Sequence, residues 1–362
     1  MRRLLPRSTE ELILWYERFI SPISLLVGFA IDVTASQALE LRTYGLVLLG
    51  YLLIASSAIF LLHALERGRL RALLPVAQFL PVIAQFGFGG LFSGFVILYS
   101  KSASFATSWV FVVLLAALLL GNERFRKLYS TLPVQVGILF VGLYSFSIFY
   151  LPIVFSSVGN QFFYLGGLVA FGGTALFMAA VAIFMPESWR ESRVAAFKGV
   201  VGLYALITLL YVVNAIPPLP LALKDAGVFH SVARDGTVYR VAYEPREWYE
   251  VYLRYETEFR RKAGDPVYVY TAVFAPTGIT TGLVHVWQWY DPIKGEWVTH
   301  DKVPFPISGG RDGGYRGYTL QRTLPDGDWR VDVKTDYGRI VGRVRFSLTT
   351  TDETIFLENG ER

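Results

Sequence analysis

The chain has 362 residues, of which 53% are hydrophobic and only 17% charged, and it contains no cysteine. Soluble proteins usually carry about a quarter charged residues, so the composition disfavours a wholly soluble chain. The absence of cysteine excludes disulfides, thiolate metal sites and a cysteine nucleophile.

Charge is distributed unevenly along the chain. Residues 1–216 hold 15 basic and 9 acidic side chains, whereas residues 217–362 hold 19 basic and 20 acidic ones. The basic excess therefore belongs to the first part. Because no basic run is interleaved with aromatics, we expect no nucleic-acid partner.

Seven apolar stretches in residues 1–216 approach the roughly 20 residues that a helix needs to cross a bilayer. They lie at about 18–35, 43–64, 75–99, 106–121, 133–155, 162–186 and 199–216. We therefore predict an α-helical membrane bundle of about seven transmembrane helices over residues 1–216. Glu10, Glu11 and Glu17 interrupt the first apolar run, which argues against a cleavable signal peptide.

The connections between these stretches alternate in charge. One set holds 13 basic residues and the other only two, Arg42 and Lys101. The positive-inside rule assigns the first set to the cytoplasm. With seven spans, the N-terminus is then cytoplasmic and residues 217–362 form an extracytoplasmic domain.

Three polar residues fall within the predicted spans. Asp32 is consistent with an ion or proton site, or with an interfacial carboxylate that reaches headgroups or a neighbouring helix. Gln78 and Gln85 are seven residues apart and share a helix face, so they fit interhelical hydrogen bonds or contact with a substrate. If the bundle is the active part, the protein is a transporter or signal transducer and these are its intramembrane polar residues.

Residues 217–227 are predicted to be an exit linker, because PPLPLAL contains three prolines that cannot continue a helix. Alternating hydrophobicity then predicts strands at about 228–233, 237–243, 266–275, 281–290, 296–303 and 315–323. A hairpin follows around Gly338. On its strands Arg330, Asp332 and Lys334 share one face, and Arg339, Arg343 and Arg345 share another.

These short strands with regular turns predict an all-β, immunoglobulin-like sandwich over 228–362. One amphipathic helix is expected at 246–262, where aromatics recur at helical spacing, although their β-propensity leaves a strand open. The recurring aromatics are Trp248, Tyr252, Tyr255 and Phe259.

Catalytic groups are sparse in this second part. His230, His285 and His300 allow a metal site in principle, but His285 lies in an aromatic strand and is more simply a packed histidine. The loop SGGRDGGY could cradle an anion or serve as a flexible connection. We therefore predict no enzyme, no metal and no cofactor.

Aromatic and arginine side chains are the stronger functional signal, because they provide flat surfaces and forked donors for glycans or extended peptides. The candidate ligand-binding residues are His285, Trp287, Trp289, Arg311, Arg316 and Tyr318. The resulting hypothesis is an outer domain, held by a helical bundle in the lipid bilayer, that binds an envelope glycan or protein partner.

A family resemblance rests on several short motifs within about residues 270–348. These are His285 with Trp287; Arg316 with Tyr318; Gly327 with Trp329, Arg330 and Val331; and Gly338 and Gly342 with Phe346. In order and spacing they resemble the family called domain of unknown function 2914. The resemblance implies a C-terminal domain of a multi-span protein in a bacterial inner membrane, with the domain in the periplasm. It implies no activity.

Overall fold

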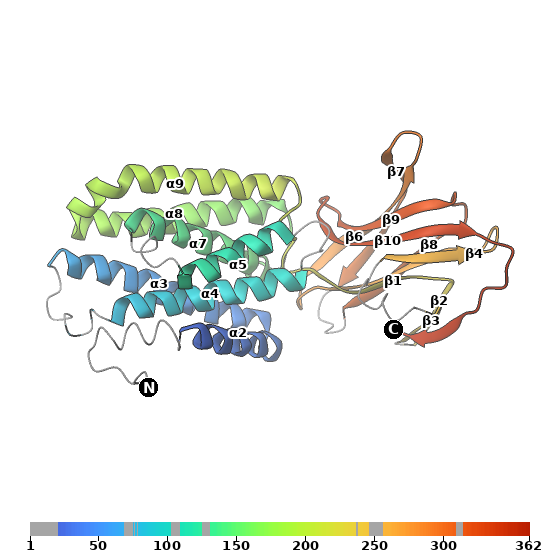
Figure 1. Ribbon diagram of the computed structural model, residues 1–362, viewed down its shortest axis with the longest axis horizontal. Helices are drawn as coiled ribbons and strands as arrows, with labels where there is room; N and C mark the ends of the chain where they lie inside the picture. Colours follow the sequence, from blue (N-terminus) through green and yellow to red (C-terminus); the bar gives the residue numbers. More distant parts are fainter. Residues whose placement is uncertain are drawn as a thin grey trace, which may run out of the picture. The chain divides into compact units, whose positions relative to one another are not determined.

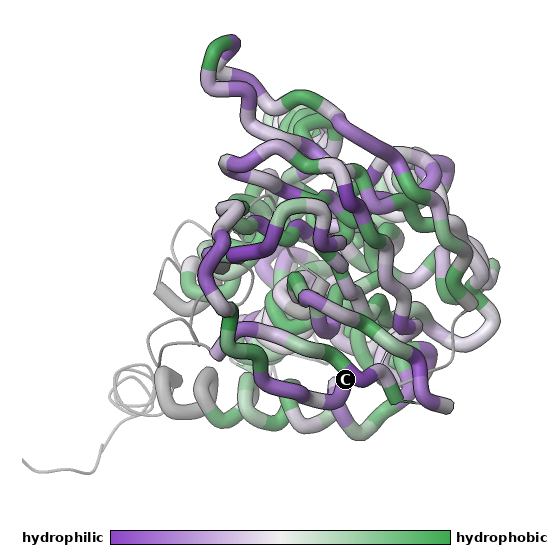
Figure 2. The backbone as a smooth tube through the Cα atoms, turned by 90° about the vertical axis from the view of Figure 1, so that its right-hand side faces the viewer, coloured by the Kyte–Doolittle hydropathy of each residue, from purple (hydrophilic) through white to green (hydrophobic). Residues whose placement is uncertain are grey.

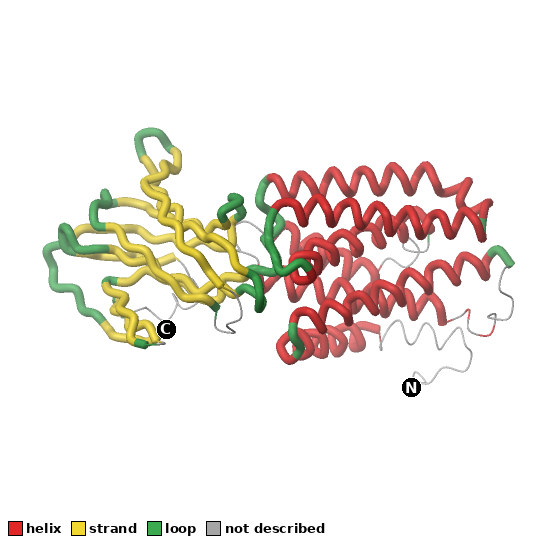
Figure 3. Tube along the Cα trace, turned by 180° about the vertical axis from the view of Figure 1, so that it is seen from behind, coloured by secondary structure: helices red, strands yellow, loops and turns green. Residues whose placement is uncertain are grey.

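The computed structural model describes residues 21–68, 75, 77, 79–102, 109–124, 131–236, 238–245, 256–308 and 314–362. Contacts divide the chain into a helical unit, which includes Gly159–Ala215 and the helices before it, and a β unit, which includes Ile216–Arg362. Helices and strands segregate accordingly along the chain (Figure 1, Figure 3).

The described part of the helical unit contains seven helices. They are α2 (Ser21–Ala38), α3 (Leu41–Glu66), α4 (Leu80–Ser102), α5 (Trp109–Arg124), α7 (Leu132–Val154), α8 (Asn160–Phe184) and α9 (Pro186–Val212). Each overlaps one of the predicted apolar stretches. Five of them, namely α3, α4, α7, α8 and α9, are long and apolar enough to cross a membrane, judged by length and composition.

The last helix begins earlier than its apolar stretch predicts. We expected a span at 199–216, but α9 starts at Pro186, and only Met185 separates it from the end of α8. Proline suits the first helical turn because its missing N–H would have no partner there, and Glu187 complements the positive end of the helix dipole. Arg190, Arg193 and Lys198, three of the 13 basic residues that we counted in the connections, therefore lie on α9 itself.

Glycines in α4 allow α3 to approach closely. A Cβ on Gly87 would lie 2.8 Å from the backbone nitrogen of Ala55, and a Cβ on Gly90 would lie 2.6 Å from the Tyr51 ring. Both distances are too short for a real contact. At Gly87 the clash is with backbone, so only glycine fits, whereas a side chain at position 90 would require the Tyr51 ring to move. Small residues serve this purpose where helices pack through van der Waals contact.

The described part of the β unit contains eleven strands: β1 (Ala222–Phe229), β2 (Ser231–Asp235), β3 (Val238–Tyr243), β4 (Glu256–Arg261), β5 (Val267–Phe274), β6 (Thr280–Asp291), β7 (Glu296–Ser308), β8 (Tyr315–Gln321), β9 (Gly327–Thr335), β10 (Ile340–Thr350) and β11 (Glu358–Glu361). They form a three-stranded sheet β1-β5-β8, a five-stranded sheet β4-β10-β9-β6-β7 and a small sheet β11-β3-β2. Hydrophilic and hydrophobic residues are interspersed along the backbone of this unit (Figure 2).

One hydrophobic core joins the two larger sheets. Trp287, Trp329 and Phe346 of the five-stranded sheet pack together with Val267 and Val269 of β5. The small sheet covers the opposite side of the three-stranded sheet, where the cluster includes Phe229, Tyr239 and Tyr270. Full burial of an aromatic side chain contributes on the order of 2–3 kcal/mol, so the tryptophan-rich core dominates the stability of this unit.

Two predictions about the β unit need correction. Residues 256–261 of the expected amphipathic helix form strand β4, which pairs in parallel with β10, whereas residues 246–255 lie outside the described residues. Phe259 is buried in the shared core, with its ring 6.2 Å from that of Phe346, so tertiary packing overrides the helical spacing. The predicted strand at 228–233 is two strands separated at His230, and β1 already begins at Ala222, inside the expected linker.

Candidate functional site

His285, a predicted ligand-binding residue, lies in the interior between the two larger sheets. It is fully buried on β6, with Nε2 2.9 Å from Oγ1 of Thr271 and Nδ1 2.9 Å from Oγ1 of Thr319. Burial lowers the pKa of His285 to about 3, so the imidazole is neutral at physiological pH. Trp287 is also fully buried, and its Nε1 donates to Oγ1 of Thr319. Neither side chain reaches the surface.

The other predicted ligand-binding residues lie apart from this pair. Trp289 packs at the edge of the core, and its Nε1 donates to the backbone oxygen of Asp326. Tyr318 lies on the other side of β8 from Thr319, is 39% exposed, and has its ring 5.8 Å from that of Tyr268. Arg316 shares that side of β8 by alternation, and its Nη1 donates to the backbone oxygen of Arg362. Arg311 lies outside the described residues.

Of the two predicted intramembrane polar residues that the structure describes, Asp32 is the more buried. It is 4% exposed on α2, and the Tyr51 hydroxyl of α3 donates to its Oδ1 over 3.4 Å. Gln85 is half-buried on α4, and Gln78 lies outside the described residues. A second buried polar contact was not predicted from the sequence. Nε2 of His63 on α3 lies 2.7 Å from Oε1 of Gln135 on α7.

A group of cations lies on the side of the five-stranded sheet that faces away from the core. Strand register places Arg343 opposite Asp332 and Arg345 opposite Arg330. On the other side of β9, Val286 of β6 lies opposite Asp332. Lys302 of β7 in turn lies opposite Val286. Residues directly opposite each other share a sheet face. We name this surface the basic sheet face and define it as Lys302, Arg330, Lys334, Arg343 and Arg345 around Asp332.

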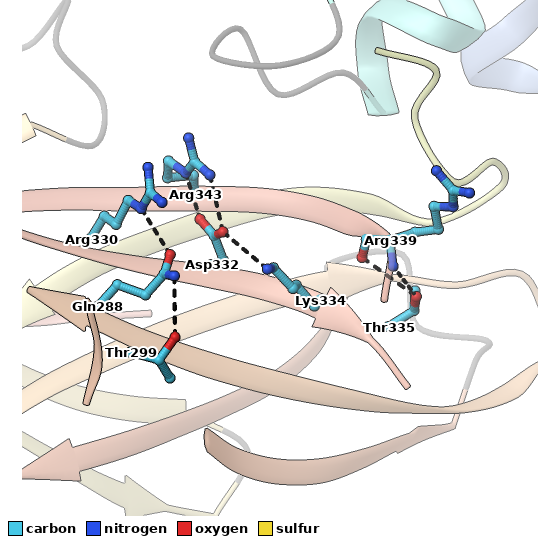
Figure 4. A network of polar contacts seen from close by, with 8 residues as sticks. All are labelled: Gln288, Thr299, Arg330, Asp332, Lys334, Thr335, Arg339 and Arg343. Atoms are coloured by element: carbon cyan, nitrogen blue, oxygen red, sulfur yellow. Dashed lines mark hydrogen bonds and ion pairs between the residues drawn. The ribbon is translucent and has the colours of Figure 1, made fainter. Parts of the chain in front are cut away.

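Asp332 forms ion pairs with two cations of the basic sheet face (Figure 4). Nε and Nη2 of Arg343 donate to its two carboxylate oxygens, and Nζ of Lys334 lies 3.5 Å from Oδ2. The side chain of Asp332 is only 2% exposed. This carboxylate thus forms a two-pronged pair with Arg343 and a longer ion pair with Lys334.

Arg330 is held rigidly at the centre of the basic sheet face. Its Nε donates to Oε1 of Gln288 over 2.8 Å, and Gln288 in turn donates to Thr299 (Figure 4). Its guanidinium lies over the Trp297 ring, 4.4 Å from the centroid. Among the described residues, its terminal Nη groups have no partner. Burial, followed by the charge of Arg343, lowers the pKa of Arg330.

The basic sheet face has the physical properties of an anion receptor. Arg345 lies directly opposite Arg330, and like charges at opposite positions of a sheet are unfavourable. The stacked, hydrogen-bonded guanidinium of Arg330 is already ordered, so a ligand that bonds its Nη groups loses little side-chain entropy. The hairpin prediction did place these arginines on shared faces. The register between strands, which makes them neighbours, was the missing information.

Metal binding has little support in the described residues, where no group of three or more His, Asp or Glu side chains lies close enough to hold an ion. His230 instead stacks on Phe259 with ring centroids 4.3 Å apart, and its Nε2 lies 3.4 Å from Oε1 of Glu244. His300 contacts the ring of Trp329. The three histidines thus have separate surroundings.

Comparisons with known proteins identify one family. No curated protein matches the sequence. Among solved structures, the Pseudomonas fluorescens alkylpurine DNA glycosylase AlkC, bound to DNA containing an abasic site analog, is similar at 13% identity over 86% of this chain and 100% of that one. Its TM-score of 0.20 supports no argument about fold or function. Residues 280–348, from β6 to β10, match the family described as protein of unknown function (DUF2914), which confirms the resemblance seen in the sequence.

Proposed function

We propose that this chain is an integral protein of a bacterial inner membrane, with about seven transmembrane helices and a cytoplasmic N-terminus. Five helices of suitable length and the uneven distribution of basic residues between connections support this topology. The β unit is then an extracytoplasmic, immunoglobulin-like sandwich. The core shared by two sheets supports that description, while the parallel pairing of β4 with β10 departs from the usual antiparallel pattern.

The proposed function is binding of an anionic ligand of the cell envelope, a glycan or a protein partner, through the basic sheet face. The observation that carries this proposal is the ordered guanidinium of Arg330, held by Gln288 and Trp297 and surrounded by cations. The helical unit anchors the β unit at the membrane. Arg316 and Tyr318, on the outer side of β8, remain a competing surface for the same function.

A capture experiment separates the two surfaces. Full-length tagged protein in detergent is incubated with envelope extract, and the material retained is compared between wild type, Arg330→Gln and the double variant Arg316→Ala/Tyr318→Ala. We expect Arg330→Gln to lose most of the captured material and the double variant to retain it. Loss only in the double variant would assign the ligand to β8. Retention in both would refute binding through either surface.

The topology has an independent test. A cysteine introduced at position 294, in the β6–β7 turn, is expected to react with a membrane-impermeant thiol reagent in intact spheroplasts. A cysteine introduced at position 126, in a basic connection, is expected to react only after lysis. The natural chain has no cysteine, so each signal comes from one site. The reverse pattern would place the β unit in the cytoplasm and overturn the proposal.

The buried Asp32 favours a second candidate function, in which the helical bundle is the active part as a transporter or signal transducer. Its carboxylate has no ion pair within the described residues, and the fully buried Tyr44 hydroxyl on α3 has no hydrogen-bond partner there. An unpaired carboxylate in a bilayer costs on the order of 3 kcal/mol and is retained mainly where it is used. A hydrophobic carbodiimide, which modifies buried protonated carboxyls, should label Asp32. Failure to label it in native membranes would remove this candidate.

A further inference from the structure

We propose that Asp32 is the anionic ligand of a binding site for a small monovalent metal cation within the helical unit. The site consists of the Asp32 carboxylate of α2, the hydroxyls of Tyr44 and Tyr51 of α3, and the hydroxyl of Ser93 of α4. We name this set the carboxylate–hydroxyl site. The inference rests on the second candidate function, because it names the ligand of the helical bundle, and it is independent of ligand binding by the β unit.

The carboxylate of Asp32 is buried without a compensating charge. Asp32 is 4% exposed, and the described part of the chain gives it no ion pair. The hydroxyl of Tyr51 donates to Oδ1 of Asp32 over 3.4 Å, which is long for a hydrogen bond between two oxygens, usually about 2.5–3.0 Å. A buried carboxylate that is held so weakly needs a counterion when it is ionised.

Two further hydroxyls beside Asp32 are buried and unsatisfied. Oη of Tyr44 and Oγ of Ser93 have no hydrogen-bond partner among the described residues, although Tyr44 is 0% and Ser93 2% exposed. Both lie close enough to Asp32 to interact with its charge. Buried hydroxyls are usually satisfied by protein groups, by water or by an ion. A ligand with several oxygen contacts therefore accounts for both of them.

Glycines on α4 bring the hydroxyls of the site together. A Cβ on Gly94 would lie 2.9 Å from Oη of Tyr44, and a Cβ on Gly90 would lie 2.6 Å from the Tyr51 ring. The two glycines are four residues apart and share a face of α4, and the two tyrosines are seven apart and share a face of α3. Both tyrosines thus lie against the segment of α4 that carries Ser93.

The chemistry of the carboxylate–hydroxyl site favours a monovalent metal cation. Its ligands are all oxygens, which bind hard cations in preference to soft ones. One carboxylate neutralises a single positive charge, whereas a divalent ion would leave an uncompensated charge in surroundings of low dielectric constant. A proton needs only the carboxylate and would leave the hydroxyls of Tyr44 and Ser93 unsatisfied.

The separation of two of the oxygens suits an ion of the size of Na⁺. Na⁺ is close in size to Ca²⁺, whose oxygen ligands lie at about 2.3–2.6 Å. Two ligands at right angles around such an ion are about 3.3–3.7 Å apart. The Tyr51 hydroxyl and Oδ1 of Asp32 are 3.4 Å apart, so one ion can contact both without a change of backbone.

Carbodiimide labelling of the full-length protein in nanodiscs tests the site. The reagent modifies a protonated carboxyl, so a bound metal cation that displaces the proton protects Asp32. Mass spectrometry gives the labelling rate of the peptide that contains Asp32, in NaCl and in choline chloride of equal ionic strength. We expect Na⁺ to slow labelling by at least about fivefold, because binding at a few times Kd lowers the free fraction by this factor. The half-protecting Na⁺ concentration should rise as the pH falls, since protons compete for the same carboxylate.

Ser93→Ala and Tyr44→Phe each remove one hydroxyl and keep the carboxylate. Both variants should still be labelled in choline chloride, but the half-protecting Na⁺ concentration should rise by about tenfold, as expected for the loss of one polar contact to a charge. Ser145→Ala and Tyr144→Phe are the matched controls on α7. They remove hydroxyls that are also buried and have no partner in the part of the chain that the structure describes. They should shift the half-protecting concentration by less than about twofold.

The outcomes separate the cation site from the function on which it rests. Equal labelling of Asp32 in NaCl and in choline chloride would refute the cation site and leave Asp32 as a proton site, so the second candidate function would stand. Absence of labelling in choline chloride would refute both. Protection that survives Ser93→Ala and Tyr44→Phe unchanged, or equal shifts in the two control variants, would refute the carboxylate–hydroxyl site.

Discussion

Acidification should destabilise the β unit through His285. The unfolded chain binds a proton on this imidazole near its usual pKa of 6.5, whereas burial lowers the pKa in the folded state to about 3. The unfolded state therefore binds more protons between these values, and stability falls as the pH falls through that window. Linkage gives a loss of about 2 kcal/mol by pH 5, and about 5 kcal/mol over the whole window.

The assay compares wild type with His285→Gln in the full-length protein. Glutamine can still hydrogen-bond to Thr271 and Thr319 but does not titrate in this range. Hydrogen exchange of peptides from β5, β6 and β8, corrected for the intrinsic effect of pH, reports the opening free energy at pH 7.5 and pH 5. We expect the wild type to lose about 2 kcal/mol more than the variant between the two conditions.

His230 contributes a loss of the same sign, because burial also lowers its pKa. That contribution is present in both proteins and cancels in the comparison. If His285→Gln shows the same pH dependence as wild type, the imidazole is either protonated in the folded state or accessible to water. Its assignment as a neutral bridge between the two sheets would then be refuted.

Two further substitution pairs test the packing and the charge network. Gly87→Ala should destabilise the helical unit by about 1–3 kcal/mol, because the new methyl group would overlap the α3 backbone. Gly28→Ala, which meets only open space, should not lower the unfolding temperature in detergent. Asp332→Asn should cost the β unit about 2–4 kcal/mol, since it leaves the largely buried Arg343 without its carboxylate. Asp235→Asn, which breaks an exposed pair, should cost less than about 1 kcal/mol in chemical denaturation.

The elements most visible in the sequence are those set by strong local patterns. Seven apolar stretches correspond to seven described helices, and the alternation on either side of Gly338 corresponds to the β9–β10 hairpin. In both cases the element buries one continuous apolar surface, and this burial produces a regular hydrophobic periodicity in the sequence. The start of α9 was harder to place, because its first turns are polar and only Pro186 and Glu187 mark them.

Strand β4 and the basic sheet face illustrate what local patterns omit. Phe259 has helical spacing to the aromatics before it, yet it packs on Phe346, which lies far along the chain. Arg330 and Arg345 become neighbours only through the register of β9 and β10. The candidate ligand set was drawn from residue types alone, so it mixed the interior His285 with the exposed Tyr318. Register and burial depend on long-range pairing, which composition and spacing leave open.

The parallel pairing of β4 with β10 also constrains the order of assembly during synthesis. Residues 256–261 leave the ribosome well before their partner at 345–350. The edge formed by β4 therefore cannot pair until most of the domain has been made. During that interval Phe259 has no Phe346 to cover it. Such non-local closure is slow and exposes apolar surface to aggregation. If the β unit crosses the membrane as it is synthesised, this strand is where an envelope chaperone would be most useful.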